Sequence, residues 1–165
     1  MRLICRHLIL NNYDSMKVFI SGTTGTESLN ENDLAFLEQI VEGNRTILIG
    51  DIFGIDKAVQ EYLLTCNYRH VIVYYSGEKV KTNIGSWKTK QILNTENMTG
   101  ENLHRIKDKA MAEDCDSGLF FCSGESESTK HTMDCMDRLD KYYLVLSEGG
   151  LGVGNMHKIN NMIML

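Results

Sequence analysis

The sequence predicts an α/β domain in which helices cover both faces of a mostly parallel sheet of about five strands. Short apolar runs alternate with amphipathic segments along the chain, and the runs are apolar throughout, as in strands buried on both faces. A length of 165 residues, with 42% hydrophobic and 24% charged side chains, suits one globular domain. Right-handed crossovers between parallel strands then produce a Rossmann-like three-layer sandwich.

The first half of the chain predicts three strands and two helices. Ser28 and Glu31 have the spacing of a capping box, which satisfies free N–H groups at a helix start. Apolar residues at helical spacing follow, and Gly43 is a typical helix end. The expected strands lie at 17–21, 46–49 and 70–75, and the expected helices contain residues 34–41 and 55–63.

The second half predicts two helices, two strands and two irregular segments. Residues 76–91 form a long polar loop with four lysines and Trp87, whose indole either stacks on a base or anchors the loop by packing. The chain ends in a segment that is rich first in glycine and then in methionine. The expected helices lie at 101–114 and 130–139, and the expected strands at 119–122 and 142–146.

We predict a domain over residues 16–146, an N-terminal arm or extension over 1–15, and a C-terminal tail over 147–165. With 17 basic and 22 acidic side chains the net charge is −5, which argues against nucleic acid or an anionic membrane as the main partner. No stretch approaches the ~20 apolar residues of a membrane span. Five cysteines without a CxxC pair suit a reduced, cytoplasmic protein without a metal site, and no cofactor is expected.

Polar, glycine-containing loops follow the predicted strands, and ligands bind parallel sheets at the carboxyl ends of their strands. Asp51 and Asp56 flank Gly54 directly after a buried strand. In one interpretation Asp51 caps a helix and Asp56 lies in its first turn; in the other, a carboxylate binds ribose hydroxyls or orients water. The candidate ligand-binding residues are Gly22, Thr23, Thr24, Gly50, Asp51, Gly54, Asp56, Ser76, Gly77, Ser123, Gly124 and Thr129.

Several segments match a known pattern: KVFISGTTG, ILIGDIFGID, HVIVYYSGE, NIGSW and KDKAMAEDCDSGLFF, at 17–25, 47–56, 70–78, 83–87 and 107–121. Through them, residues 16–146 resemble the SLOG superfamily of Rossmann-like nucleotide-binding domains, especially its circularly permuted YpsA-like branch. The resemblance places SGESEST (123–129) at a phosphate loop. It implies binding of a nucleotide or an ADP-ribose-like sugar in signalling.

The leading hypothesis is therefore a sensor or sequestering domain for a small nucleotide-type ligand, with neither nucleic acid nor membrane as partner. The alternative is an enzyme that hydrolyses or transfers the N-glycosidic bond of a nucleotide, as related phosphoribohydrolases do. Asp51 and Asp56 are its candidate catalytic residues, by analogy with glycoside chemistry. A third hypothesis, an interaction module without a ligand, predicts a homodimer formed through helix faces.

Overall fold

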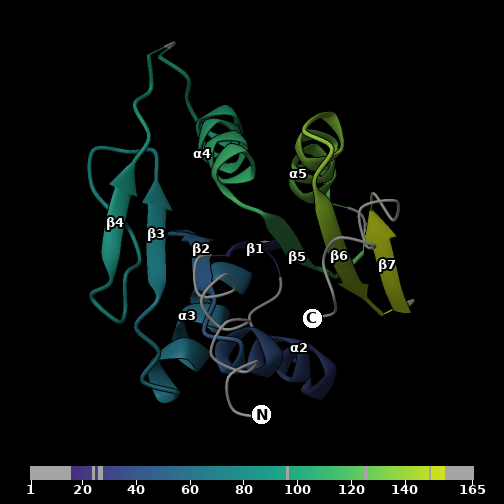
Figure 1. Ribbon diagram of the computed structural model, residues 1–165. Coiled ribbons are helices and arrows are strands. Elements are labelled where there is room, and N and C mark those ends of the chain that lie inside the picture. The colour runs from purple at the N-terminus through teal and green to yellow at the C-terminus, as the bar shows by residue number, and fades with distance from the viewer. Residues whose placement is uncertain are drawn as a thin grey trace, which may run out of the picture.

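The computed structural model describes residues 16–23, 25, 28–95, 97–124, 126–148 and 150–154. In this part of the chain, seven strands form one sheet in the order β4-β3-β2-β1-β5-β6-β7 (Figure 1), parallel except for the antiparallel pair β6–β7. The elements are β1 (Lys17–Gly22), α2 (Glu31–Glu42), β2 (Thr46–Gly50), α3 (Ile55–Thr65), β3 (Val71–Tyr75), β4 (Lys88–Gln91), α4 (Glu101–Asp114), β5 (Ser117–Cys122), α5 (Glu127–Arg138), β6 (Tyr142–Ser147) and β7 (Gly150–Gly154).

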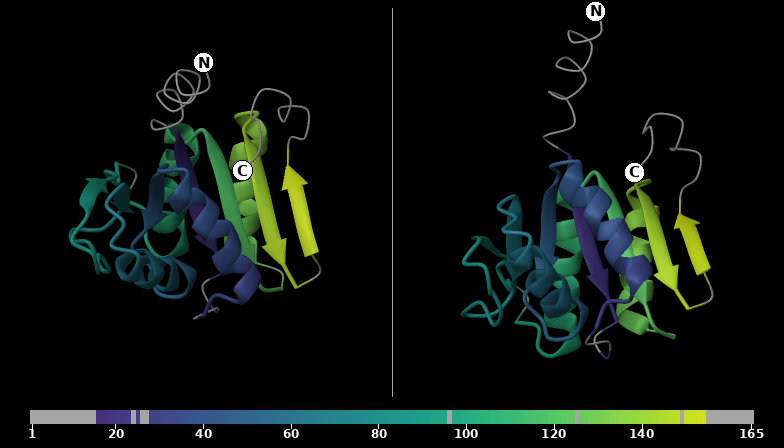
Figure 2. Two further views of the ribbon diagram at one scale, coloured as in Figure 1. Left: turned by 60° about the horizontal axis from the view of Figure 1, so that its bottom comes forward. Right: turned by 90° about the horizontal axis from the view of Figure 1, so that it is seen from below.

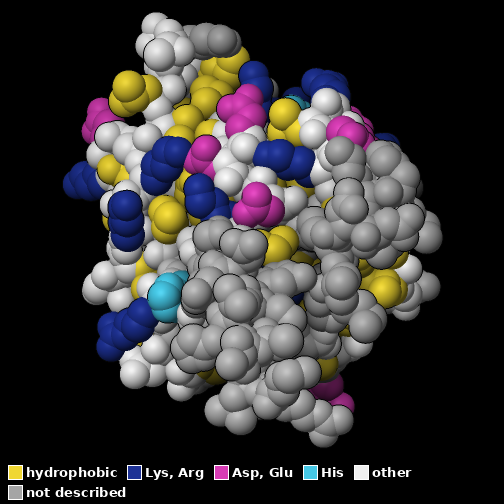
Figure 3. All heavy atoms as spheres, in the orientation of Figure 1, with side chains coloured by type: hydrophobic (Ala, Val, Ile, Leu, Met, Phe, Trp, Pro, Cys, Tyr) yellow, Lys and Arg dark blue, Asp and Glu magenta, His cyan; other side chains and the backbone are white. Residues whose placement is uncertain are grey.

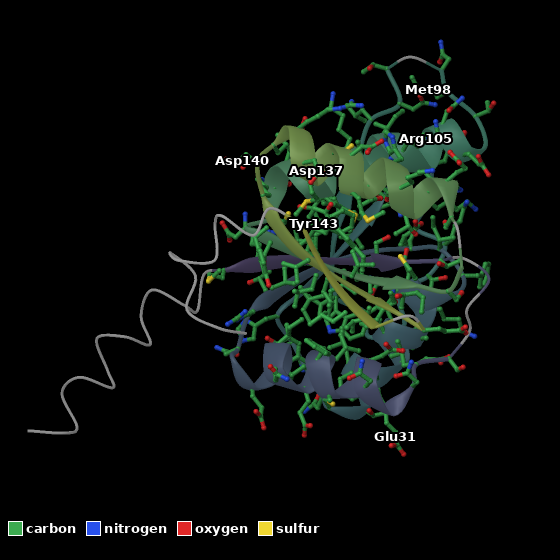
Figure 4. All side chains as sticks on the ribbon, turned by 90° about the vertical axis from the view of Figure 1, so that its right-hand side faces the viewer. Glu31, Met98, Arg105, Asp137, Asp140 and Tyr143 are labelled. Atoms are coloured by element: carbon green, nitrogen blue, oxygen red, sulfur yellow. The ribbon has the colours of Figure 1, made fainter. Side chains whose placement is uncertain are left out.

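The sheet lies between two helix layers, with α2 and α3 on one face and α4 and α5 on the other (Figure 2). Successive side chains of the central strand β1 point to opposite faces of the sheet. Val18 and Ile20 pack with α2 and α3, whereas Phe19 packs with α4 and α5. On the second face, Tyr143 also donates a hydrogen bond from its hydroxyl to the Asp137 carboxylate at 3.1 Å, which ties β6 to α5 (Figure 4). The predicted three-layer α/β fold is confirmed.

The prediction of about five strands was too low, because neither outer strand has the continuous apolar run that marked the other five. β4 lies inside the predicted loop 76–91, and its sequence KTKQ is exposed at every position. β7 lies inside the predicted tail, and its sequence GLGVG pairs with β6. Edge strands bury fewer side chains than central ones, so a search for continuous apolar runs does not find them. Residues 1–15 and 155–165 lie outside the described residues.

Two helix starts differ from the prediction. The capping box of α2 is formed by Asn30 and Asp33 rather than by Ser28 and Glu31: the Asn30 side chain accepts from the Asp33 N–H, and the Asp33 carboxylate accepts from the Asn30 N–H, both at 3.0 Å. Helix α5 begins at Glu127, three residues earlier than predicted, because the Ser126 side chain caps it. In a capping box, Asn can take the place of Ser and Asp the place of Glu. The three-residue spacing therefore did not distinguish Asn30 and Asp33 from Ser28 and Glu31.

The strand order reverses between β1 and β5, so their carboxyl ends form the switch point of the sheet. Two hydrogen bonds join the chain after β1 to the end of β5. The Thr23 N–H donates to the Phe121 carbonyl at 2.9 Å, and the Ser123 N–H donates to the Thr23 hydroxyl at 3.1 Å. Among the described residues, no helix has the length and apolar character to cross a bilayer.

Candidate functional site at the carboxyl ends of the strands

The predicted site residues lie along the edge of the sheet that the carboxyl ends of the strands form, and they follow one another in strand order. Ser76 and Gly77 follow β3, the loop from Gly50 to Asp56 follows β2, Thr23 follows β1, and Ser123 and Gly124 follow β5. Since neighbouring strands are about 4.8 Å apart, the ends of β3 and β5 are separated by roughly 14 Å. The structure therefore distributes these residues over several hollows rather than gathering them around one ligand.

A buried charged cluster occupies the middle of this edge. The Lys107 ammonium, on α4, lies 3.8 Å from the carboxylate of Asp56, on α3, and 3.5 Å from that of Asp108. The Lys107 side chain is 2% exposed and the two carboxylate side chains are less than a tenth exposed. Because α3 and α4 cover opposite faces of the sheet, the Lys107–Asp56 pair links the two helix layers across the end of β2.

Burial and charge perturb the pKa values of this cluster. Desolvation raises the pKa of Asp56 to about 6, although the Lys107 charge works in the opposite direction. Desolvation would lower the pKa of Lys107, but the charges of Asp108, Asp56 and Asp51 outweigh it and raise that pKa above its usual value. The neighbouring His104 has a lowered pKa because of its burial and the nearby charges of Lys107 and Lys81. Perturbed groups of this kind are typical of functional sites.

Gly50, at the end of β2, is required by this cluster, and Gly54, in the loop that follows, is required by the backbone conformation. At Gly50, a Cβ atom would stand against the Asp56 carboxylate and the Lys107 ammonium, so the space above the strand end is filled by the ion pair rather than by an open ligand site. Gly54 has φ of 93° and ψ of −134°, which side-chain-bearing residues rarely adopt. Gly54 is also the N-cap of α3, so the interpretation of Asp51 as the cap is wrong; Asp56 lies in the first turn, as predicted.

Asp51 instead holds the next loop, since its carboxylate accepts a hydrogen bond from the Lys81 N–H at 2.9 Å. The fully buried Gln60 adds to this anchor: its amide donates to the carbonyls of Gly50 and Thr82 at 3.0 and 3.1 Å and accepts from the Ile84 N–H at 3.0 Å. The loop between β3 and β4 is therefore fixed against β2 and α3.

Trp87 is a packing anchor of the same loop. Its side chain is 7% exposed, and its indole N–H donates to the Tyr68 carbonyl at 2.8 Å. The alternative in which Trp87 stacks on a base does not fit this burial.

The candidate residues that follow β5 are only partly available to a ligand. Gly124 is exposed with φ of 72°, whereas Thr129 is 3% exposed within α5. The Thr129 hydroxyl lowers the pKa of the neighbouring Cys122 thiol, against the larger effect of burial, which raises it. Thr24, the remaining candidate of the first loop, lies outside the described residues.

Sequence reasoning missed Lys107, Asp108 and Phe53 as site residues. Together with Asp56 they line a narrow crevice at the switch point. The sequence did contain a signal for Lys107. Leu103, Lys107 and Met111 are spaced four residues apart and so share one helix face, which is apolar except for Lys107. Phe53 carried no such signal, and the structure leaves it 66% exposed beside the buried cluster.

Positive charge is concentrated beside this edge. Residues 79–95 contain four lysines and no Asp or Glu, although the whole chain has a net charge of −5. Lys79, Lys81, Lys88 and Lys90 are all exposed. Several Lys and Arg side chains lie over β3, β4 and α4 in Figure 3. A net charge averages over the molecule and did not reveal this local excess.

Comparison with known proteins identifies the fold. No family model matches the chain, and no curated protein matches it. A solved structure of DNA processing protein A from Helicobacter pylori, described for its single-stranded DNA binding mode, is similar, with a TM-score of 0.61 and 13% sequence identity. The similarity covers 83% of this chain and 67% of that chain.

This comparison contradicts two predictions. The sequence predicted a nucleotide or a nucleotide-derived sugar as the ligand and excluded nucleic acid as a partner, whereas a protein of similar fold is described for its single-stranded DNA binding mode. The net charge did not justify that exclusion, because phosphate binding depends on the local density of lysine and arginine, not on the charge of the whole chain.

Proposed function

We propose that this chain binds single-stranded DNA along the carboxyl-end edge of its sheet, beside the lysine-containing segment 79–95. The observation that carries the proposal is this segment, which has four exposed lysines and no acidic side chain in an otherwise acidic protein. Each lysine that neutralises a phosphate releases a condensed counterion, which favours binding. The similarity of the fold to a single-stranded DNA-binding protein supports the same function.

Two of the four lysines have the best position for phosphates. The Lys81 backbone is anchored to Asp51 at the end of β2, so its side chain starts at the edge, and Lys79 is two residues away. Lys90 is less available, because its ammonium pairs with the Asp114 carboxylate and lies 5.3 Å from the centre of the Tyr74 ring. We therefore assign Lys79 and Lys81 the main phosphate contacts.

An exposed aromatic side chain supports a single strand rather than a duplex. Phe53 is 66% exposed in the loop that follows β2, next to the lysines in strand order. Unpaired bases stack on aromatic rings with a gain of about 1–3 kcal/mol per base, whereas the bases of a duplex are stacked on one another. Membership of the SLOG superfamily stays a prediction, and the proposed function does not depend on it.

The test is fluorescence anisotropy with a labelled oligothymidylate of about 16 nucleotides, titrated with the full chain at several salt concentrations. We expect the double variant Lys79→Gln, Lys81→Gln to bind more weakly and to reduce the slope of log K against log salt by about 0.7 for each lysine. The charge-matched control is Arg69→Gln, Arg138→Gln, which removes two exposed cations near the opposite edge of the sheet. Absence of binding by the wild type, or equal effects of the two double variants, would refute the proposal.

A further inference from the structure

A hollow of about 370 Å³ lies at the carboxyl ends of β3 and β4, where the chain turns toward α4. Its volume falls within the range of roughly 300–1,000 Å³ that is common for small-ligand pockets. Two lysines are close to it in the chain, since Lys79 lies in the loop after β3 and Lys90 is the second-last residue of β4. The lining residues are Ser76, Gly77, Glu78, Gln91, Ile92, Leu93, Asn94 and Leu103.

Hydrogen bonds hold the walls of this hollow in place. The Gln91 amide donates to the Gly77 carbonyl at 2.9 Å, and the Ile92 N–H donates to the Tyr75 carbonyl at 2.8 Å, so the loops after β3 and β4 are joined. The Asn94 side chain donates to the Met98 carbonyl at 2.7 Å and accepts from the Met98 N–H at 2.8 Å, which closes the following turn. A hollow with fixed walls loses little conformational freedom when a ligand enters.

The walls combine an apolar surface with a polar rim. Ile92, Leu93 and Leu103 supply the apolar part, and Leu93 is 71% exposed, so a large apolar side chain faces solvent at an otherwise polar edge. Ser76, Gln91 and Asn94 supply hydroxyl and amide groups. A nucleobase has the matching chemistry, with two apolar faces and a rim of hydrogen-bonding atoms.

The charges indicate which part of a nucleotide enters. Glu78 is the acidic residue in the lining, and a carboxylate there repels a phosphate but not a neutral base. Lys79 lies next to Glu78 in the chain, and Lys90 precedes Gln91 at the opposite wall. With this arrangement we expect the phosphates to stay outside the hollow, near Lys79, while the base turns inward.

We propose that this hollow binds one unpaired nucleobase of a single strand, with Leu93 as the residue that contacts the face of the base. The proposal rests on the proposed single-stranded DNA binding and names a subsite for it. Phe53 follows β2, which is one strand from β3 and two from β4, so the strand ends from which the two loops start are about 5–10 Å apart. Neighbouring nucleotides of one strand can therefore occupy the hollow and stack on Phe53.

The experiment compares Leu93→Ser with the control Leu64→Ser, in the full chain, by the same anisotropy assay. Leu64 is 47% exposed near the carboxyl end of α3, away from the hollow, so both variants remove one exposed leucine and both are expected to fold. The probes are short oligothymidylates, intact or with one abasic position moved along the strand. Circular dichroism melting of both variants checks that the fold is kept.

We expect Leu93→Ser to weaken binding of the intact oligonucleotide about tenfold, because an apolar contact with the base is lost, and Leu64→Ser to leave it unchanged. One abasic position should cost the wild type a similar factor and should cost Leu93→Ser much less, because the same contact is already lost. The subsite would be overturned by equal affinities of the two variants, or by a loss of affinity at the abasic position that is as large in Leu93→Ser as in the wild type. The proposed function would still stand in that case if Lys79→Gln, Lys81→Gln weakens binding. A wild type that does not bind any of the oligonucleotides refutes both.

Discussion

The Lys107 ammonium lies 3.8 Å from the Asp56 carboxylate, and the two residues belong to helices on opposite faces of the sheet. The contact passes over the end of β2, where Gly50 has no side chain to obstruct it. Both partners are buried, and Asp108 adds a second carboxylate 3.5 Å from the same ammonium. A buried charge is tolerated only with its partners in place, so this pair couples the two helix layers at the middle of the candidate site.

Replacing Lys107 by methionine should strongly destabilise the fold. The change keeps the length of the side chain but leaves Asp56 and Asp108 buried without a cation, and breaking a buried pair in this way costs about 3–5 kcal/mol. Urea denaturation at pH 7 measures the loss of unfolding free energy. Lys109→Met, an exposed lysine of the same helix, is the control and should change stability by less than about 0.5 kcal/mol. A Lys107→Met protein as stable as this control would contradict the role of the pair.

Asp56→Asn should change the pH dependence of stability. The folded pKa of Asp56 is about 6, above the ordinary 3.8, so the folded protein binds this proton more tightly than the unfolded chain does. The resulting stabilisation is present below pH about 4 and is lost as the pH rises through about 6. Relative to Asp56→Asn, which does not titrate, the wild type should lose roughly 2 kcal/mol between pH 4 and pH 7.

The measurement for Asp56→Asn is a series of urea denaturation curves at several pH values for both proteins. Other carboxylates titrate in both, so the difference between the two curves isolates Asp56. A difference that stays constant across this pH range would show that the folded pKa of Asp56 is not raised.

Gly50→Ala should destabilise the protein, even though alanine is compatible with a strand. The new methyl group would meet the Asp56 carboxylate and the Lys107 ammonium, so one of them must move from its partner. We expect a loss of about 1–3 kcal/mol, the usual cost of overpacking a buried site. Thermal denaturation measures it, with Gly77→Ala as a control, because the nearest neighbour of a Cβ at Gly77 is an ordinary 3.7 Å away. Equal melting temperatures would show that the cluster has room to adjust.

Gln60→Leu should loosen the loop between β3 and β4. The change removes the partner of two carbonyl groups and of the Ile84 N–H, and each buried polar group left unsatisfied costs about 1–3 kcal/mol. Hydrogen exchange should become faster at Ile84 while the amides of β1 stay protected. Gln39→Leu, at an exposed position of α2, is the control and should leave exchange unchanged. Protection of Ile84 in Gln60→Leu would mean that packing alone holds the loop.

Much of the fold could be predicted because its signals are local. Helix α4 spans residues 101–114 as predicted, and the strands β1, β2, β3, β5 and β6 each lie within two residues of the expected bounds. Asp51, Asp56 and Ser123 were also placed correctly at the carboxyl ends of strands, since a loop that follows a parallel strand has no other position. These features depend on residues close together in the chain.

The sequence by itself therefore determined the layers of this protein and the edge on which its polar loops meet. The tertiary structure alone decided the rest. It paired β4 with β3 and β7 with β6, brought Lys107 across β2 to Asp56, buried Trp87 and left Phe53 exposed. Each of these outcomes depends on contacts between segments far apart in the chain, and hydrophobic periodicity carries no information about which distant side chain will fill a given space.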